Sequence, residues 1–173
     1  MEPLTESQRR PGKRSHVCLA GKHADAVTAA RRAVELDPDS YVTRMALQGV
    51  LHFSGRLEKS VAAGELALDI SGRLSWSMTF LAVTFAEWEK PNEADAIYSE
   101  MLARSRRQYV PSAQLALAAA AASREDDALR HAGDAFQIRD PDCQVFFSPH
   151  IAYSGPLYEA LAFSRNGRSQ WSK

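Results

Sequence analysis

Residues 21–40 read GKHADAVTAARRAVELDPDS, and the small residues of this stretch return at a fixed interval along the chain. The interval is 34 residues. Two columns carry mostly alanine: Ala26, Ser60, Ala94 and Ala128, and seven residues further on Ala33, Ala67, Met101 and Ala135. Three more columns share the register: Gly21, Gly55, Glu89 and Ser123; Val34, Leu68, Leu102 and Phe136; and Leu47, Leu81 and Leu115. A repeat of this length indicates a short array of one helical hairpin, in which small residues mark the close crossing of two helices.

The register also predicts where each helix begins and ends. The expected ranges are 24–36, 41–53, 58–70, 75–87, 92–105, 111–122 and 125–138. Start signals agree with them, because Ser40 offers an N-cap and Pro91 and Pro111 stand at the beginning of later helices. The helix over 111–122 is apolar all round from Leu115 to Ala122, so we expect it to be buried on more than one side.

The repeating unit resembles the tetratricopeptide repeat (TPR). Unit one carries a glycine that ends a first helix, two alanines in the second helix and a closing proline: Gly21, Ala26, Ala33 and Pro38. Later units depart from this pattern at Gly72, which replaces the proline, and at Glu89, which replaces the glycine. The resemblance covers roughly residues 13–141. It implies an all-α fold, a right-handed superhelical array of about four TPR-like hairpins with a C-terminal capping helix.

We expect three parts along the chain. Residues 1–12 form a mobile N-terminal arm, residues 13–141 form the repeats (about 13–40, 41–74, 75–108 and 109–141), and residues 142–173 form a capping segment and tail. Only about residues 13–20 are left for the leading helix of unit one. The last part contains the apolar run Val145, Phe146 and Phe147, and a final helix from about Pro156 to Arg165.

The order of the C-terminal features extends the resemblance. The features are a long turn at 104–110, the run Glu125-Asp126-Asp127-Ala128, the closing Arg139-Asp140-Pro141 and the sequence PLYEAL at 156–161. This order is similar to the C-terminal TPR region of bacterial adenylate cyclases and winged-helix transcriptional regulators. The similarity implies a bacterial origin. It leaves an alternative function open, in which the chain is the detached C-terminal regulatory part of such a multidomain protein.

Composition and motifs argue against several function classes. Lys and Arg number 21 and so do Asp and Glu, which speaks against a general attraction to nucleic acid or to a membrane surface. The cluster Arg104, Arg106 and Arg107 is interpreted as a solvated helix end. No cysteine or histidine spacing predicts a metal site, and Gly21-Lys22-His23 lacks the hydroxyl residue of a phosphate loop, so Gly21 is interpreted as a hairpin turn. We therefore expect no cofactor and no catalysis, and with neither a signal peptide nor a membrane-spanning run we expect a cytoplasmic protein.

The predicted function is noncovalent binding in a concave groove, which the first helix of every hairpin lines. The predicted groove residues are Met45, Gly49, His52, Phe53, Trp76, Thr79, Phe80, Val83, Glu87 and Gln114, together with Leu117. This surface is mostly apolar and lacks the cations of a carboxylate clamp, so the expected partner is an amphipathic helix. Two alternatives stay open: Trp76 and Phe80 belong to the core, or a second copy of the chain covers an apolar edge as a homodimer.

Overall fold

The structure is a computed structural model that describes residues 20–143. The predicted arm, nearly all of the first leading helix and the segment beyond Cys143 lie outside the described residues. Within them the chain is all-helical, without strands. The helices are α1 (Ala20–Leu36), α2 (Tyr41–Phe53), α3 (Leu57–Ser71), α4 (Ser75–Glu87), α5 (Pro91–Ser105), α6 (Ser112–Ala121) and α7 (Glu125–Gln137). The predicted helix ranges are confirmed to within one residue, except at the start of α1.

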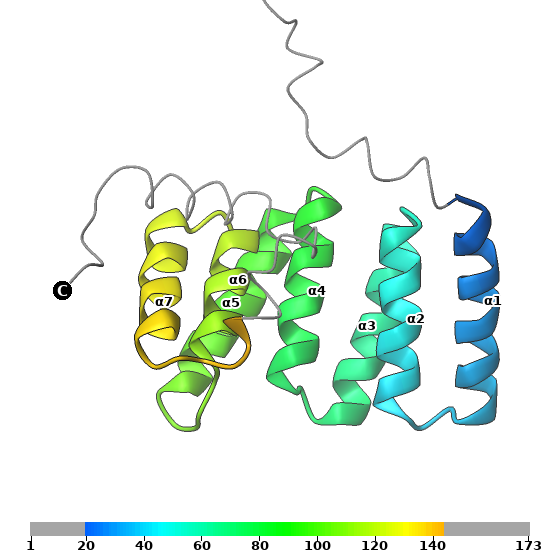
Figure 1. The fold of residues 1–173 in the computed structure, drawn as a ribbon, viewed down its shortest axis with the longest axis horizontal. Helices are drawn as coiled ribbons and strands as arrows, with labels where there is room; N and C mark the ends of the chain where they lie inside the picture. Colours follow the sequence, from blue (N-terminus) through cyan, green and yellow to red (C-terminus); the bar gives the residue numbers. More distant parts are fainter. Residues whose placement is uncertain (1–19, 144–173) are drawn as a thin grey trace, which may run out of the picture.

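The helices stand side by side in chain order, with α1 at one end and α7 at the other (Figure 1). Each helix packs against the next one along the chain, and α4 also packs extensively against α6. Contacts between neighbours in sequence therefore build the described part of the molecule.

The turns inside the three described hairpins repeat the same backbone geometry at the 34-residue interval. The residue in the turn has a positive φ in each hairpin: 73° at Gly55, 58° at Glu89 and 57° at Ser123. The N–H of the next residue then donates to the carbonyl five residues back: Arg56 to Leu51 at 2.9 Å, Lys90 to Phe85 at 2.9 Å and Arg124 to Ala119 at 2.8 Å. These bonds form the Schellman pattern that ends a helix. Glutamate and serine thus hold a left-handed conformation that glycine adopts at lower cost.

The interpretation of Gly21 as a hairpin turn is wrong. Helix α1 begins at Ala20, so Gly21 lies inside its first turn. Glycine is tolerated at this place because the first N–H groups of a helix need no intrahelical acceptor, so little is lost when the residue there is a poor helix former.

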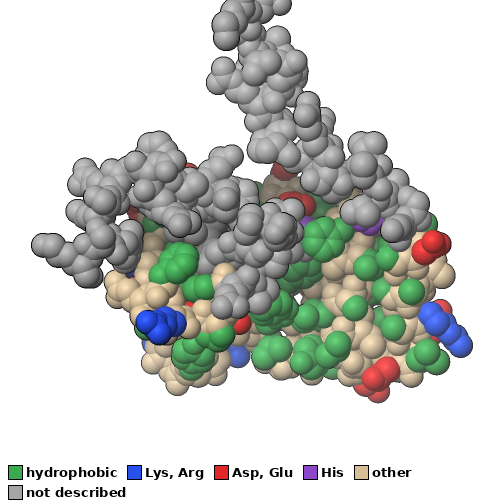
Figure 2. All heavy atoms as spheres, in the orientation of Figure 1, with side chains coloured by type: hydrophobic (Ala, Val, Ile, Leu, Met, Phe, Trp, Pro, Cys, Tyr) green, Lys and Arg blue, Asp and Glu red, His purple; other side chains and the backbone are tan. Residues whose placement is uncertain are grey.

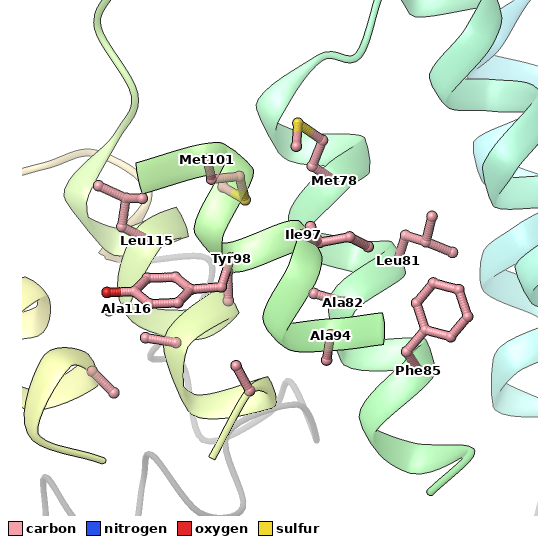
Figure 3. Packing of buried hydrophobic residues seen from close by; sticks show 14 of the residues in the cluster. Met78, Leu81, Ala82, Phe85, Ala94, Ile97, Tyr98, Met101, Leu115 and Ala116 are labelled. Atoms are coloured by element: carbon pink, nitrogen blue, oxygen red, sulfur yellow. The ribbon is translucent and has the colours of Figure 1, made fainter. Parts of the chain in front are cut away.

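The small-residue columns lie where the hairpins close. Ser60, Ala94 and Ala128 are at most 3% exposed, and so are Ala67, Met101 and Ala135. Figure 3 shows how α5 is held between its neighbours: Ile97 points toward Leu81 of α4, while Tyr98 points toward Ala116 of α6. The largely apolar helix α6 is buried on more than one side, as predicted, because every residue from 113 to 119 is buried.

Unit two exchanges volume between two positions of the repeat. Gln48 of α2 is fully buried, and neither its Nε2 nor its Oε1 has a hydrogen-bond partner. A Cβ built on Gly64 of α3 would lie 2.6 Å from that Nε2, so the glycine makes room for the amide. The equivalent pair is Ala82 and Tyr98 in unit three and Ala116 and Ala132 in unit four. The large residue thus lies in the first helix of the hairpin in unit two (Gln48) and in the second helix in unit three (Tyr98). Unit four has alanine at both positions.

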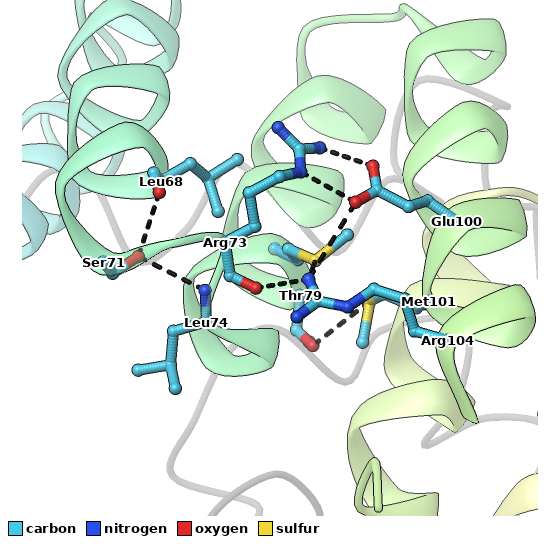
Figure 4. Close-up of polar contacts among 9 residues, drawn as sticks. Leu68, Ser71, Arg73, Leu74, Thr79, Glu100, Met101 and Arg104 are labelled. Carbon is cyan, nitrogen blue, oxygen red and sulfur yellow. Dashed lines mark hydrogen bonds and ion pairs between the residues drawn. The ribbon is translucent and has the colours of Figure 1, made fainter. Parts of the chain in front are cut away.

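Ionic contacts link the α3–α4 turn to α5 (Figure 4). Arg73 donates to both carboxylate oxygens of Glu100, at 2.7 and 2.5 Å, and Arg104 donates to the carbonyl of Arg73 at 2.6 Å. The hydrogen bond from Arg73 is the main reason why the pKa of Glu100 lies below its ordinary value. Arg104 thus lies in the last turn of α5, as predicted for a helix-end cation, but its side chain is only 29% exposed and is not fully solvated. Its side chain reaches back to the preceding turn instead.

Candidate protein-binding face

The structure brings predicted groove residues of α2 and α4 into contact. The Ser77 hydroxyl of α4 lies 3.2 Å from Met45 Sδ of α2. One turn further on, a Cβ built on Gly49 would lie 3.9 Å from Cζ of Phe80, which is ordinary contact distance. Gly49 of α2 and Phe80 of α4 therefore lie next to each other at the contact between the two helices.

His52 joins the same two helices by polar contacts. Its Nδ1 lies 3.1 Å from Thr84 Oγ1, and its Nε2 lies 3.3 Å from Glu87 Oε2. Its ring also packs against Phe53, with centroids 5.3 Å apart, and against Phe80, with centroids 5.4 Å apart. His52 and Glu87, both predicted to contact a partner, thus bind each other, and His52 is only 3% exposed. The role of Thr84 was missed because no sequence column relates it to position 52.

Four other predicted groove residues, Thr79, Val83, Gln114 and Leu117, are buried, which corrects their assignment to an accessible surface. Thr79 is fully buried and its Oγ1 points toward Met101 of α5 at 3.9 Å (Figure 4). Val83 packs with Leu117 in a small core cluster, and Gln114 is 4% exposed. The physical reason is that α4 packs against α3, α5 and α6 at once, so most of its circumference is core.

Of the accessible remainder, Glu87 is exposed and charged, and the other five residues form what we call the α2–α4 face: Met45, Gly49, Phe53, Trp76 and Phe80. Phe53 is 41% exposed, and the other four residues are partly buried. Trp76 packs in part against the cluster of Val83 and Leu117. Figure 2 shows hydrophobic side chains gathered over α2 and α4, with Lys and Arg mostly near the two ends of the array. This face is apolar, and it belongs to two successive hairpins.

The chain crosses α6 directly after α7. Asp140, 3% exposed, accepts hydrogen bonds through its carboxylate from the N–H of Ala113 at 3.1 Å and from the N–H of Asp142 at 3.0 Å. Asp142 in turn accepts from Gln114 Nε2 at 2.6 Å. Because Ala113 lies in the first turn of α6, Asp140 satisfies one of the N–H groups that the helix itself leaves open. A short segment from 140 to 142 is thereby fixed on the N-terminal end of α6.

Cys143 follows this segment and packs, partly buried, against the cluster of Val83, Ala113 and Leu117. Burial raises the pKa of its thiol to about 11, and the nearby carboxylates of Asp140 and Asp142 act in the same direction. The thiol is therefore protonated at neutral pH and behaves as a small apolar side chain. Sequence reasoning did not place Cys143 near the groove.

The part of the chain that the structure describes gives no group of three or more His, Cys, Asp or Glu side chains suited to a metal ion. None of its helices combines the length and the apolar character that a membrane crossing requires. No protein-family model matches the chain, and no curated protein matches it significantly.

Proposed function

We propose that the chain is a non-catalytic protein–protein interaction module, a TPR-like right-handed superhelical array that binds an amphipathic helix on its α2–α4 face. The observation that supports this function most is that apolar side chains of two successive hairpins come together. Phe53 and Phe80 pack on the His52 ring, Met45 contacts Ser77, and Trp76 lies one helical turn before Phe80 on α4. Surfaces of this composition, with aromatic and thioether side chains, are typical of protein interfaces. The identical turns at Gly55, Glu89 and Ser123 support the repeat architecture.

The chemistry of the face favours a helix over a charged peptide. A charged peptide terminus needs paired cations, and the charged residue predicted for the groove, Glu87, is an anion already engaged by His52. An amphipathic helix instead presents apolar residues at a spacing of three or four, which fits a surface built from side chains on two neighbouring helices.

A selection experiment tests this function without a known partner. A displayed library of helical 20-residue peptides is selected on the wild-type chain, and the selected peptides are then measured on two variants by fluorescence anisotropy. Phe53→Asp places a charge on the face, and Leu66→Asp is the matched control because Leu66 of α3 is 48% exposed and outside the face. Circular dichroism confirms that both variants keep their helices.

We expect selected peptides with apolar residues at positions i, i+3, i+4 and i+7. Their affinity should fall at least tenfold on Phe53→Asp and stay within twofold on Leu66→Asp, because a charge in a desolvated contact costs more than about 1.4 kcal/mol. A selection that yields no binder, or binders that Phe53→Asp leaves unchanged, would refute the proposed function.

A further inference from the structure

We propose that the C-terminal segment of this chain, residues 144–173, is the resident occupant of the α2–α4 face, so that a partner helix binds by displacing it. The inference rests on the proposed function for the identity of the face and adds how its occupation is regulated. Three observations support it: the direction of the chain at its last described residue, the burial of α6, and the sequence that follows.

The first observation is the fixed course of residues 140–143. Asp140 is bonded to Ala113 and Asp142 is bonded to Gln114, which holds the chain against the N-terminal end of α6. Cys143 and Trp76 are both partly buried, and both pack against the cluster of Val83, Ala113 and Leu117. Since Trp76 also belongs to the α2–α4 face, the chain leaves the described residues at the border of that face.

The second observation is that α6 is buried around its whole circumference. Seven consecutive residues, 113–119, are buried, which is nearly two turns. The helices that pack most extensively against α6 are α4, α5 and α7. The corresponding helix α2, which lies between α1 and α3, has only three buried residues, Gln48, Leu51 and His52. A helix rich in alanine and leucine, without a polar face, is stable only when other residues cover all of its sides. On α6 this includes the side that corresponds to the α2–α4 face.

The third observation is the sequence after Cys143. Val145, Phe146 and Phe147 follow at once, and a helix is expected from about Pro156 to Arg165. Residues 144–155, about a dozen, span up to roughly 40 Å when extended, and successive helices pack roughly 8–10 Å apart. Phe147, four residues after Cys143, can reach roughly 14 Å, which is enough to pass from α6 to Phe80 of α4. The full span of residues 144–155 is long enough to bring the expected helix to Phe53.

Photo-crosslinking in the full chain tests the inference. The photoreactive residue p-benzoylphenylalanine replaces Phe80, and irradiation is done at low micromolar concentration with mass-spectrometric mapping of the products. The control places the same residue at Leu66, on α3. A second variant adds Phe146→Asp and Phe147→Asp to the Phe80 chain, and circular dichroism checks helix content throughout.

We expect most crosslinks from position 80 to join residues 144–165 of the same chain. We also expect this product to fall at least fivefold in the double aspartate variant and to be absent with the reactive residue at position 66. A crosslink between two chains would assign the face to a second copy and overturn the inference. Products confined to residues 20–143, or no product, would overturn it as well.

A synthetic peptide of residues 144–165 separates this inference from the proposed function. Added to the double aspartate variant, it should crosslink to position 80, since the face is then vacated for a peptide in trans. If the peptide crosslinks but the wild-type segment never does, the proposed function survives and the inference fails. If neither crosslinks, both fail.

Discussion

The Gly64→Ala substitution tests the volume exchange between Gln48 and Gly64 in unit two. Alanine at position 64 would bring a methyl group 2.6 Å from Gln48 Nε2 and 2.7 Å from Gln48 Cδ. The amide is the far end of a side chain, yet Gln48 has no exposed area and must push against packed neighbours to move. The methyl group would therefore overlap with the Gln48 amide, which the surrounding packing leaves no room to move.

Two effects of opposite sign set the magnitude. Replacing glycine by alanine inside a helix stabilises by about 0.8–1 kcal/mol, whereas overpacking a full site costs about 1–3 kcal/mol. We expect a net loss of up to roughly 2 kcal/mol in the wild-type background. In a Gln48→Ala background the methyl group meets no amide, and the same substitution should stabilise by up to about 1 kcal/mol. The coupling energy between the two positions is then about 1–3 kcal/mol.

The assay is a double-mutant cycle of urea unfolding followed by circular dichroism, on the wild type, both single variants and the double variant. Equal slopes with urea would show that the variants unfold between comparable states. The reasoning is refuted if Gly64→Ala changes the unfolding free energy equally in both backgrounds, within about 0.5 kcal/mol. Additivity would mean that the amide has space elsewhere and that Gly64 is not its counterpart.

Further outcomes follow from single contacts. Glu89→Gly should raise the unfolding free energy by up to about 1 kcal/mol, because glycine adopts the positive φ at this position without strain. Gly55→Ala should lower the unfolding free energy by a similar amount, and the added Cβ meets no atom within 4 Å. Urea unfolding measures both changes. Burial lowers the pKa of His131, so the unfolded chain takes up a proton before the folded chain as pH falls below about 6.5. The unfolding free energy should therefore decrease as the pH is lowered from 7.5 to 5. Urea unfolding at several pH values measures this decrease, which should be smaller in His131→Gln. Arg73→Gln should cost only about 0.2–1 kcal/mol at pH 7, because the ion pair is exposed. Below pH 4.5, where Glu100 takes up its proton in the unfolded chain first, the difference between wild type and Arg73→Gln should diminish, and a constant difference down to pH 3 would contradict the assigned pair.

The sequence predicted the helices well because their limits depend on local signals. Ser40 accepts a hydrogen bond from the Thr43 N–H, and α5 begins at Pro91, as the cap and proline rules require. The turn at Glu89 also follows from its column, although the residue type there does not favour a positive φ.

The side chains of the candidate site were harder to predict because they depend on how helices cross. Thr79 and Phe80 are adjacent in α4, and the 34-residue register does not say that α5 buries the first while α2 meets the second. Likewise, the contact between His52 and Glu87 depends on the spacing of α2 and α4. The hydrogen bonds of Asp140 depend on where the chain returns after α7, which no repeat column describes.

The neighbour-to-neighbour packing of the helices bears on how the protein folds. Among the described helices, the extensively packed pairs are consecutive in the chain apart from α4 and α6. Contacts so close in sequence close only short loops, so folding is expected to be fast and to begin wherever two adjacent helices first pair. Because the contacts are local, we also expect individual helices to detach from the array at different free energies. Among the helices that the structure describes, α1 packs extensively against α2 alone. Its contacts with the described part therefore open at a lower free energy than those of α4, which packs extensively against three helices.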